Sequence, residues 1–452
     1  MTSSRPGTPS WKTRFFSIWT GQQLSLVGSR VVQFALVWWL TDLTGSATVL
    51  ATASMVALIP EILLGPIAGA YVDRWSRRIA MMVADGVVAL ASLGLAYLFW
   101  VDAMQIWHIY VIMLVRAVGG SFHWPAMEAS TSLMVPKKHL TRVAGLNQTM
   151  NGVLNIVGPP LGALLLELLP PHGVMLTDVG TALLAIGPLF FVPIPQPQRS
   201  GQGEGAVAPS IWGDLREGLQ YIRDWPGLLA LIGMAMGVKI ALTPAFALLP
   251  LLVREHFNGG VAQLSLLESV VGTGIVTGGL LLGAWGGFRR KIYTTLVGMG
   301  ALGIGFVVLG LTPAGWFWLG LACVFVAGLV IPLVDGPIMA ILQSTVSPEI
   351  QGRVFMLMGS LLSLTSPFGL AVAGPVSDWL GLSVWYLTAG VLCGATGLAG
   401  FFIPAIVGIE DNNGCFVPGH KTSAGGAVRA AAETGDKRAH EARGDTILER
   451  TR

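Results

Sequence analysis

A set of ionisable side chains lies inside the long apolar runs of this sequence, where charge is costly. Its members are Arg30, Glu61, Arg116, His123, Lys239, Glu268 and Asp335. Charges at such depth usually pair with one another or serve the passage of an ion or proton. A buried ion pair that never titrates is the competing interpretation for each of them.

Proton coupling is the chemistry that these groups could perform. It needs a carboxyl group near mid-membrane that is neutral in one facing state and charged in the other, with a cation nearby. Glu61 and Arg30 both lie ~17–21 Å from the same predicted membrane face, at ~1.5 Å per helical residue, so they could pair. Glu61 is therefore the first candidate for the coupling group. Asp335 is the main competitor, and Glu268 is a further one.

The composition indicates that the helices holding these ionisable side chains span a membrane. The chain has 452 residues, of which 53% are hydrophobic and 11% charged, against about 25% charged in soluble domains. Apolar runs long enough to cross a ~30 Å hydrocarbon core recur along it. We place twelve spans at 15–41, 47–72, 79–101, 105–132, 143–167, 173–193, 227–253, 261–286, 292–311, 315–345, 353–377 and 381–407.

Basic residues collect in alternate loops, which predicts the orientation of the chain. Clusters such as Lys137-Lys138 and Arg289-Arg290-Lys291 fall on one side of the predicted membrane, whereas Arg254 falls on the other. By the positive-inside rule, both termini are cytoplasmic in a bacterial inner membrane. The three cysteines have neither metal-ligand nor disulfide spacing.

An internal repeat predicts the architecture. Arg77-Arg78 recurs as Arg289-Arg290 at an offset of 212, and the Phe190 segment FFVP recurs near Phe401 as FFIP at 211. The offset of 212 also aligns His123 with Asp335. We therefore expect an all-α membrane protein with twelve transmembrane helices in two pseudo-symmetric six-helix bundles.

The domain organisation follows from the spans and from shifts in composition. The predicted units are an N-terminal bundle (1–195), a cytoplasmic linker with an amphipathic helix (196–226), a C-terminal bundle (227–407) and a disordered cytoplasmic tail (408–452). In the linker helix, Ile211, Leu215, Leu219 and Ile222 share one face, which favours a position on the membrane surface.

One corner between two spans combines small residues, an acid and bases. It contains Gly65, Gly69, Asp73, Arg74, Arg77 and Arg78. The glycines, four residues apart, would let a neighbouring backbone approach, and the Asp73 carboxylate could accept hydrogen bonds at a partner helix end. An ordinary positive-inside loop would share the arginines. The full pattern resembles the signature loop between helices 2 and 3 of the major facilitator superfamily, where it gates the change of conformation.

Two further motifs resemble elements of this superfamily. Arg116-Ala-Val-Gly119 resembles the helix 4 Arg-x-x-Gly motif, whose arginine is linked to proton transfer, although a purely structural arginine is the alternative. Gly158-Pro159-Pro160-Leu161-Gly162 resembles the Gly-Pro-x-x-Gly element of antiporters, which favours antiport over symport. The match is partial, because Leu154 and Ala163 stand where the family has glycine.

The resemblance extends to one branch of the superfamily. The opening WKTRFFSIWTGQQLSLVGS, the stretch SFHWPAM and the stretch QGRVFMLMGSLLSL look like the macrolide-efflux branch of the third drug:proton antiporter family. This implies a proton-driven exporter of amphipathic organic molecules. A siderophore or metabolite exporter is the alternative, since three cavity cations would suit an anionic substrate.

Other classes of protein fit less well. A membrane-embedded enzyme would need a nucleophile and base or a metal set, and His123 with Glu128 is the nearest candidate but lacks further ligands. A sensor would depend on the tail, which shows no fold signal. We expect no cofactor, metal or nucleic acid, and a monomer whose partners are the lipid bilayer, protons and a small amphipathic substrate.

Overall fold

The computed structural model describes residues 10–194 and 211–411. Every regular element in these residues is a helix. The first half contributes α1 (Trp11–Thr44), α2 (Ala47–Arg74), α3 (Arg77–Trp100), α4 (Ile106–Met134), η1 (Lys137–His139), α5 (Leu140–Leu168) and α6 (Pro171–Phe191). The second contributes α7 (Ile211–Asp224), α8 (Pro226–Ala247), α9 (Leu249–Leu251), η2 (Leu252–His256), α10 (Val261–Trp285), α11 (Lys291–Leu311), α12 (Phe317–Thr345), α13 (Pro348–Leu380), α14 (Leu382–Phe402) and α15 (Pro404–Val407).

Among the described residues, twelve helices are long and apolar enough to cross a membrane, so the protein is a multi-pass membrane protein. They correspond to the twelve predicted spans, with shifts at the ends. The largest difference is at the span predicted over 227–253, where α8 stops at Ala247 and a π-helical turn follows over Leu252–His256. Pro244 and Pro250 lie in this segment, and each removes a backbone donor.

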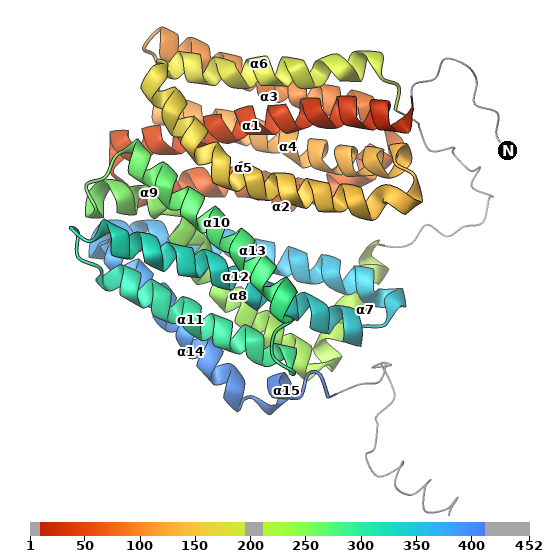
Figure 1. The fold of residues 1–452 in the computed structure, drawn as a ribbon, viewed down its shortest axis with the longest axis vertical. Helices are drawn as coiled ribbons and strands as arrows, with labels where there is room; N and C mark the ends of the chain where they lie inside the picture. The colour runs from red at the N-terminus through yellow and green to blue at the C-terminus, as the bar shows by residue number, and fades with distance from the viewer. Residues whose placement is uncertain (1–9, 195–210, 412–452) are drawn as a thin grey trace, which may run out of the picture.

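The long helices pack as two bundles (Figure 1). In the first, α1 and α3 both pack on α6, and α4 packs on α2 and α3. In the second, α11 packs on α12 and α14, while α10 packs on α12. We call the side where α1 begins and α14 ends the terminal side, and the other the opposite side. The predicted fold class is thereby confirmed.

Glycine allows the closest helix contacts in the second bundle. A Cβ added to Gly278 of α10 would lie 2.0 Å from the carbonyl oxygen of Leu329 in α12. One added to Gly303 of α11 would lie 2.5 Å from the backbone nitrogen of Gly394 in α14. Since apolar burial gives no preference for protein over lipid tails, such backbone packing supplies much of the association within a membrane bundle.

The two halves meet across a pseudo-two-fold axis on the opposite side. There the Nε of Arg254 lies 2.8 Å from Oδ1 of Asp42. These residues are 212 positions apart, which is the offset of the sequence repeat, and equivalent positions can touch only where the axis passes between them. Both side chains are about half exposed, at 43% and 55%, so the pair contributes roughly 0–1 kcal/mol.

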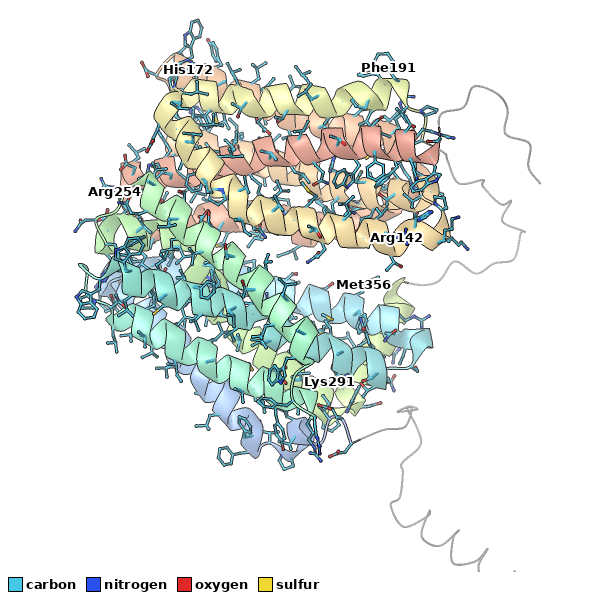
Figure 2. All side chains as sticks on the ribbon, viewed as in Figure 1. Arg142, His172, Phe191, Arg254, Lys291 and Met356 are labelled. Atoms are coloured by element: carbon cyan, nitrogen blue, oxygen red, sulfur yellow. The ribbon has the colours of Figure 1, made fainter. Side chains whose placement is uncertain are left out.

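The contact between bundles is uneven along the membrane normal. At mid-length, Ser269 of α10 donates a hydrogen bond to the Ile156 carbonyl of α5, and Gly272 faces the Asn155 carbonyl. On the opposite side, Asp378 of α13 binds the start of α2. On the terminal side, a cavity of about 480 Å³ separates α2 and α4 from α13. Figure 2 shows Arg142 and Met356 on the two bundles at this open side.

Helix α7 packs against protein more than the sequence predicts. Ile222 is 3% exposed, and Tyr221 and Trp225 are also buried. Gly218 lies so close to α13 that an added Cβ would meet Leu357 at 2.3 Å. The amphipathic helix is therefore present as predicted, but its described apolar side chains Tyr221 and Ile222 pack against the protein beside α13, while Leu219 stays 43% exposed.

The second bundle extends slightly past the predicted start of the tail at 408. Ile409 is fully buried, a Glu410 carboxylate oxygen accepts a hydrogen bond from the Ile292 backbone N–H at 2.7 Å, and Asp411 pairs with Arg290. These residues close the N-terminal end of α11. The rest of the predicted tail lies outside the described residues.

We expect a stop codon after Asp411 to leave the stability unchanged, and one after Gly408 to lower the melting temperature by roughly 5 °C. The longer truncation removes a buried isoleucine and a helix cap, each of which contributes about a kilocalorie per mole or more, and a half-exposed ion pair that contributes less. Fluorescence-detected size-exclusion chromatography after heating measures both variants. Equal stability of the two would show that residues 409–411 do not hold α11.

Candidate functional site

The cavity between the bundles contains an acid and a base from different bundles. Arg30 of α1 and Glu268 of α10 both line a cavity of about 410 Å³, and Arg30 is close enough to act electrostatically on Glu268. Residues of α1, α2, α5, α8, α9 and α10 enclose this space. The two charges therefore line the same cavity from opposite bundles.

The antiporter-like motif of α5 positions Arg30. Gly158 packs on Arg30, with an added Cβ at 3.4 Å from the arginine Cβ, and Gly162 packs on Phe34 one turn further along α1. A side chain at Gly162 would overlap the Phe34 ring at 2.7 Å. Pro159 itself lines the cavity that holds Arg30. The close packing predicted for these glycines is confirmed, and its consequence is a fixed place for the arginine.

Glu61 lies in a different cavity from the one shared by Arg30 and Glu268. It lines the space of about 480 Å³ between α2, α4 and α13, together with Gly120 and Ser363. The described side chains show no ion pair between Glu61 and Arg30, which is the pairing that the depths in the sequence suggested. Helix depth fixes the level of a side chain but not the direction in which it points, and this explains the difference.

Lys239 and Asp335 share a third cavity, of about 380 Å³, inside the second bundle. Lys239 comes from α8 and Asp335 from α12, and the lysine acts electrostatically on the carboxylate. Most of the lining is apolar and rich in methionine, with Met234, Met299, Met339 and Met358. Flexible, polarisable methionine walls adapt to ligands of different shape.

His123 belongs to a compact network inside the first bundle. The side-chain amide of Gln22 donates to Asp85 Oδ2 at 2.9 Å, so its carbonyl oxygen accepts from His123 Nε2 at 2.7 Å. The same ring nitrogen lies 3.3 Å from Asp85 Oδ1. Glu128 lines a cavity of about 500 Å³ together with His123 and Asn147. The structure thus joins His123 to Asp85 through α1, and places Asp85 in this network.

Arg116 forms an ion pair that the sequence analysis did not foresee. Its guanidinium donates to Asp178 of α6 and to the Ser92 hydroxyl of α3. Ser29 of α1 also donates to Asp178, at 2.9 Å, and the aspartate is fully buried. Four helices meet at this carboxylate, which supports the structural interpretation of Arg116 as the hub of the first bundle.

Asp178 is not among the deep charges that the sequence predicted to form the site. The signal was available, since Asp178 is an acidic residue inside the apolar run PHGVMLTDVGTALLAIGPLFF. An acid at such depth requires a partner. Arg116 is a deep cation of the same half, so the two could have been matched by charge alone.

The corner between α2 and α3 is described in part. A Cβ added to Gly65 would meet nothing within 4 Å, and Gly65 lines the terminal-side cavity, so the close approach predicted there is wrong for this conformation. Arg77 is buried, and Arg78 donates a hydrogen bond to the Phe190 carbonyl at the end of α6. Gly69, Asp73 and Arg74 belong to α2, but their side-chain surroundings lie outside the described residues.

No cluster of three or more metal-ligating side chains occurs within residues 10–194 and 211–411. The described ionisable groups within the apolar segments instead form acid and base pairs, two inside the first bundle, one inside the second and one, Arg30 with Glu268, that lines the cavity between the bundles. Such an arrangement can bind and release protons or hold a charged ligand.

Comparison with known proteins identifies the class. Residues 18–370 match the Major Facilitator Superfamily, and the chain belongs to that family. Macrolide efflux protein A of Streptococcus pyogenes is 33% identical over 383 residues, covering 85% of this chain and 94% of that protein. The multidrug efflux pump Tap of Mycobacterium bovis is 26% identical over 406 residues, covering 85% and 91%. The family and its macrolide-efflux resemblance are thereby confirmed.

Solved structures agree on the fold. A bacterial homologue of the iron transporter ferroportin in an inward-facing state superposes with a TM-score of 0.65 at 16% identity, covering 86% of this chain and 99% of that one. A D-xylose–proton symporter superposes with a TM-score of 0.64 at 14% identity, covering 85% and 96%. At these identities the similarity concerns the fold alone.

We expect Asp178→Leu to destabilise the protein by about 3–5 kcal/mol, because it leaves the Arg116 charge buried without its partner. The double variant Arg116→Leu with Asp178→Leu should recover most of that loss. Thermal unfolding of the purified single and double variants measures the difference. If the stability losses of the single variants Asp178→Leu and Arg116→Leu simply add in the double variant, Arg116 and Asp178 do not act as a pair.

Proposed function

We propose that this protein is a proton-coupled antiporter that exports amphipathic organic molecules, macrolide-like drugs among them, by alternating access. The observation that carries the proposal is the placement of Arg30 and Glu268 on opposite bundles within one cavity. Rocking of the bundles would change the distance between them and with it the stability of the charged carboxylate. The pairs Arg116–Asp178, His123–Asp85 and Lys239–Asp335 each lie inside a single bundle, so such a motion would leave them intact.

The same geometry favours Glu268 over Glu61 as the coupling group. A coupling carboxylate needs an environment that differs between the two facing states. Glu268 faces a cation that belongs to the other bundle, whereas Glu61 lines a cavity without a basic residue in its lining. Asp335 remains the competitor, although its partner Lys239 moves with it.

Two features support an amphipathic substrate. Relatives 33% and 26% identical to this chain are a macrolide efflux protein and a multidrug efflux pump. The methionine-rich cavity of the second bundle combines apolar walls with one acid and one base at its lining. This combination suits molecules that are largely apolar but carry a charged or polar group.

The proposed orientation places the terminal side in the cytoplasm of a bacterial cell, with the protein in the inner membrane. Basic residues of the described loops gather on that side, including Lys137, Lys138 and Arg290, whereas Arg254 lies on the opposite side. Positive charge favours the cytoplasmic side of a membrane. In this orientation the structure is open to the cytoplasm, ready to receive substrate from inside.

A siderophore or metabolite exporter is the second candidate function, and it would carry an anionic substrate. The sequence suggested an anionic substrate because three cations, Arg30, Arg116 and Lys239, lie within predicted spans. Arg116 is neutralised by Asp178, and the other two face Glu268 and Asp335. The geometry therefore leaves little uncompensated positive charge for an anion.

The decisive experiment follows macrolide-driven proton release in everted vesicles with a pH-sensitive dye. We expect Glu268→Gln to reduce release at least tenfold, because the neutral side chain can no longer exchange a proton. Macrolide binding to the purified variant should stay within about threefold of the original protein. Glu61→Gln and Asp335→Asn should each do less than Glu268→Gln.

Glu167→Gln is the matched control, since it removes an exposed carboxylate from the opposite-side end of α5. Full proton release by Glu268→Gln would show that another group couples the protons. If proton release were lost only in Glu61→Gln, Glu61 would be that group. Macrolide uptake that proceeds in the original protein without any proton movement would overturn the antiport mechanism.

A further inference from the structure

Asp378, at the opposite-side end of α13, makes a set of hydrogen bonds to the other bundle. Its carboxylate accepts from the Ser46 hydroxyl at 2.9 Å, from the Ala47 backbone N–H at 2.6 Å and from the Thr48 backbone N–H at 3.0 Å. Ala47 and Thr48 are the first residues of α2. One side chain of the second bundle therefore caps a helix of the first.

The chemistry of a helix start explains why this contact is favourable. The first backbone N–H groups of a helix have no partner inside it, and the helix dipole places partial positive charge there. A carboxylate that accepts these bonds satisfies both at once. The hydroxyl of Ser46 accepts a bond from Val49, the next N–H along, so Ser46 and Asp378 together cover the start of α2.

The backbones also meet closely at this point. Gly374 lies one turn before Asp378, and an added Cβ would come within 2.8 Å of the Thr48 Cα and 3.1 Å of the Ala51 Cβ. Glycine is required here because any larger side chain would push α13 away from α2. The cap thus forms only when the opposite-side ends of these two helices are in contact.

The equivalent helix pair lacks this arrangement. By the repeat offset of 211, Asp378 corresponds to Glu167 at the end of α5. Glu167 is exposed, and α10 caps itself, since the Gln263 side chain accepts the Gly260 backbone N–H at 2.9 Å. The α5–α10 pair is instead joined at mid-length through Ser269 and Ile156. The printed polar contact of α2 with α13 therefore lies at the helix ends, whereas that of α5 with α10 lies at mid-length.

We propose that Asp378 is a latch for the opposite side: a positioning residue that stabilises the conformation open on the terminal side by capping α2 from the other bundle. Breaking these bonds is a necessary step of each opening on the opposite side. The inference rests on the alternating-access function proposed above, but it concerns the balance of conformations and not the coupling chemistry.

The test measures that balance directly. Cys323, Cys393 and Cys415 are replaced by alanine, spin labels are placed at positions 142 and 356 on the terminal side, and the distance between them is measured in nanodiscs by double electron–electron resonance. We expect Asp378→Ala to raise the ratio of short to long distances by roughly tenfold, the size of effect that loss of a helix cap produces. Asp378→Asn should fall between, because its amide oxygen still accepts a bond from the helix start.

Glu167→Ala is the control, because it removes the equivalent carboxylate that caps no helix. A ratio in Asp378→Ala equal to that in Glu167→Ala would overturn the latch, as would Asp378→Asn behaving like Asp378→Ala. Gly374→Leu provides a second variant that forces the same helix ends apart, and it should shift the ratio in the same direction. The readout needs neither substrate nor proton gradient, so it can succeed or fail independently of the transport assay.

Discussion

Two rigid bundles that touch at mid-length can close on one side of the membrane only by separating on the other. The contact of α5 with α10 at Ser269 and Gly272 provides this central support. Around it the structure is closed on the opposite side by Asp378 and the ion pair of Asp42 with Arg254, and it is open on the terminal side. The exposed ion pair contributes little by comparison with a helix cap. The cap on α2 is therefore the principal polar contact of the closed side.

Two buried charge pairs help to hold the helices of the first bundle together. Arg116 with Asp178 ties four helices at a fully buried carboxylate, and His123 with Asp85 joins α4 to α3 by way of Gln22. Breaking such a pair in a low-dielectric interior costs several kilocalories per mole, so these pairs oppose separation of the helices that they join. The second bundle relies more on backbone contact through glycine, as at Gly278. Ion pairs in the first bundle and glycine contacts in the second therefore both hold neighbouring helices together.

The groups that remain between the bundles are those that a rocking motion can affect. Arg30 is fixed by Gly158, and Glu268 faces it from α10. This links a motif associated with antiport to a particular side chain, since the glycines of α5 determine how closely α1 can approach. A motif recognised by its glycines and prolines thus determines where Arg30 lies, which is the role that the proposed mechanism gives it.

The sequence by itself determined the fold, because the signals involved are local or periodic. The length of each apolar run, the alternation of basic loops and the repeat at 211 and 212 together specify twelve helices in two related halves. The family followed from motifs whose residues are close together in the chain. The depth of each charge was also readable, since it depends only on the rise per residue.

Only the tertiary structure decided which charges meet. Arg30 and Glu61 share a depth but line different cavities, whereas Arg116 meets Asp178 of a helix 62 residues away. Rotation of each helix about its axis sets these pairings, and packing against neighbouring helices sets that rotation. The cap of α2 by Asp378, across 330 residues and more, has the same origin. Chain position carries no information about it, because it exists only while two bundles are in contact on one side.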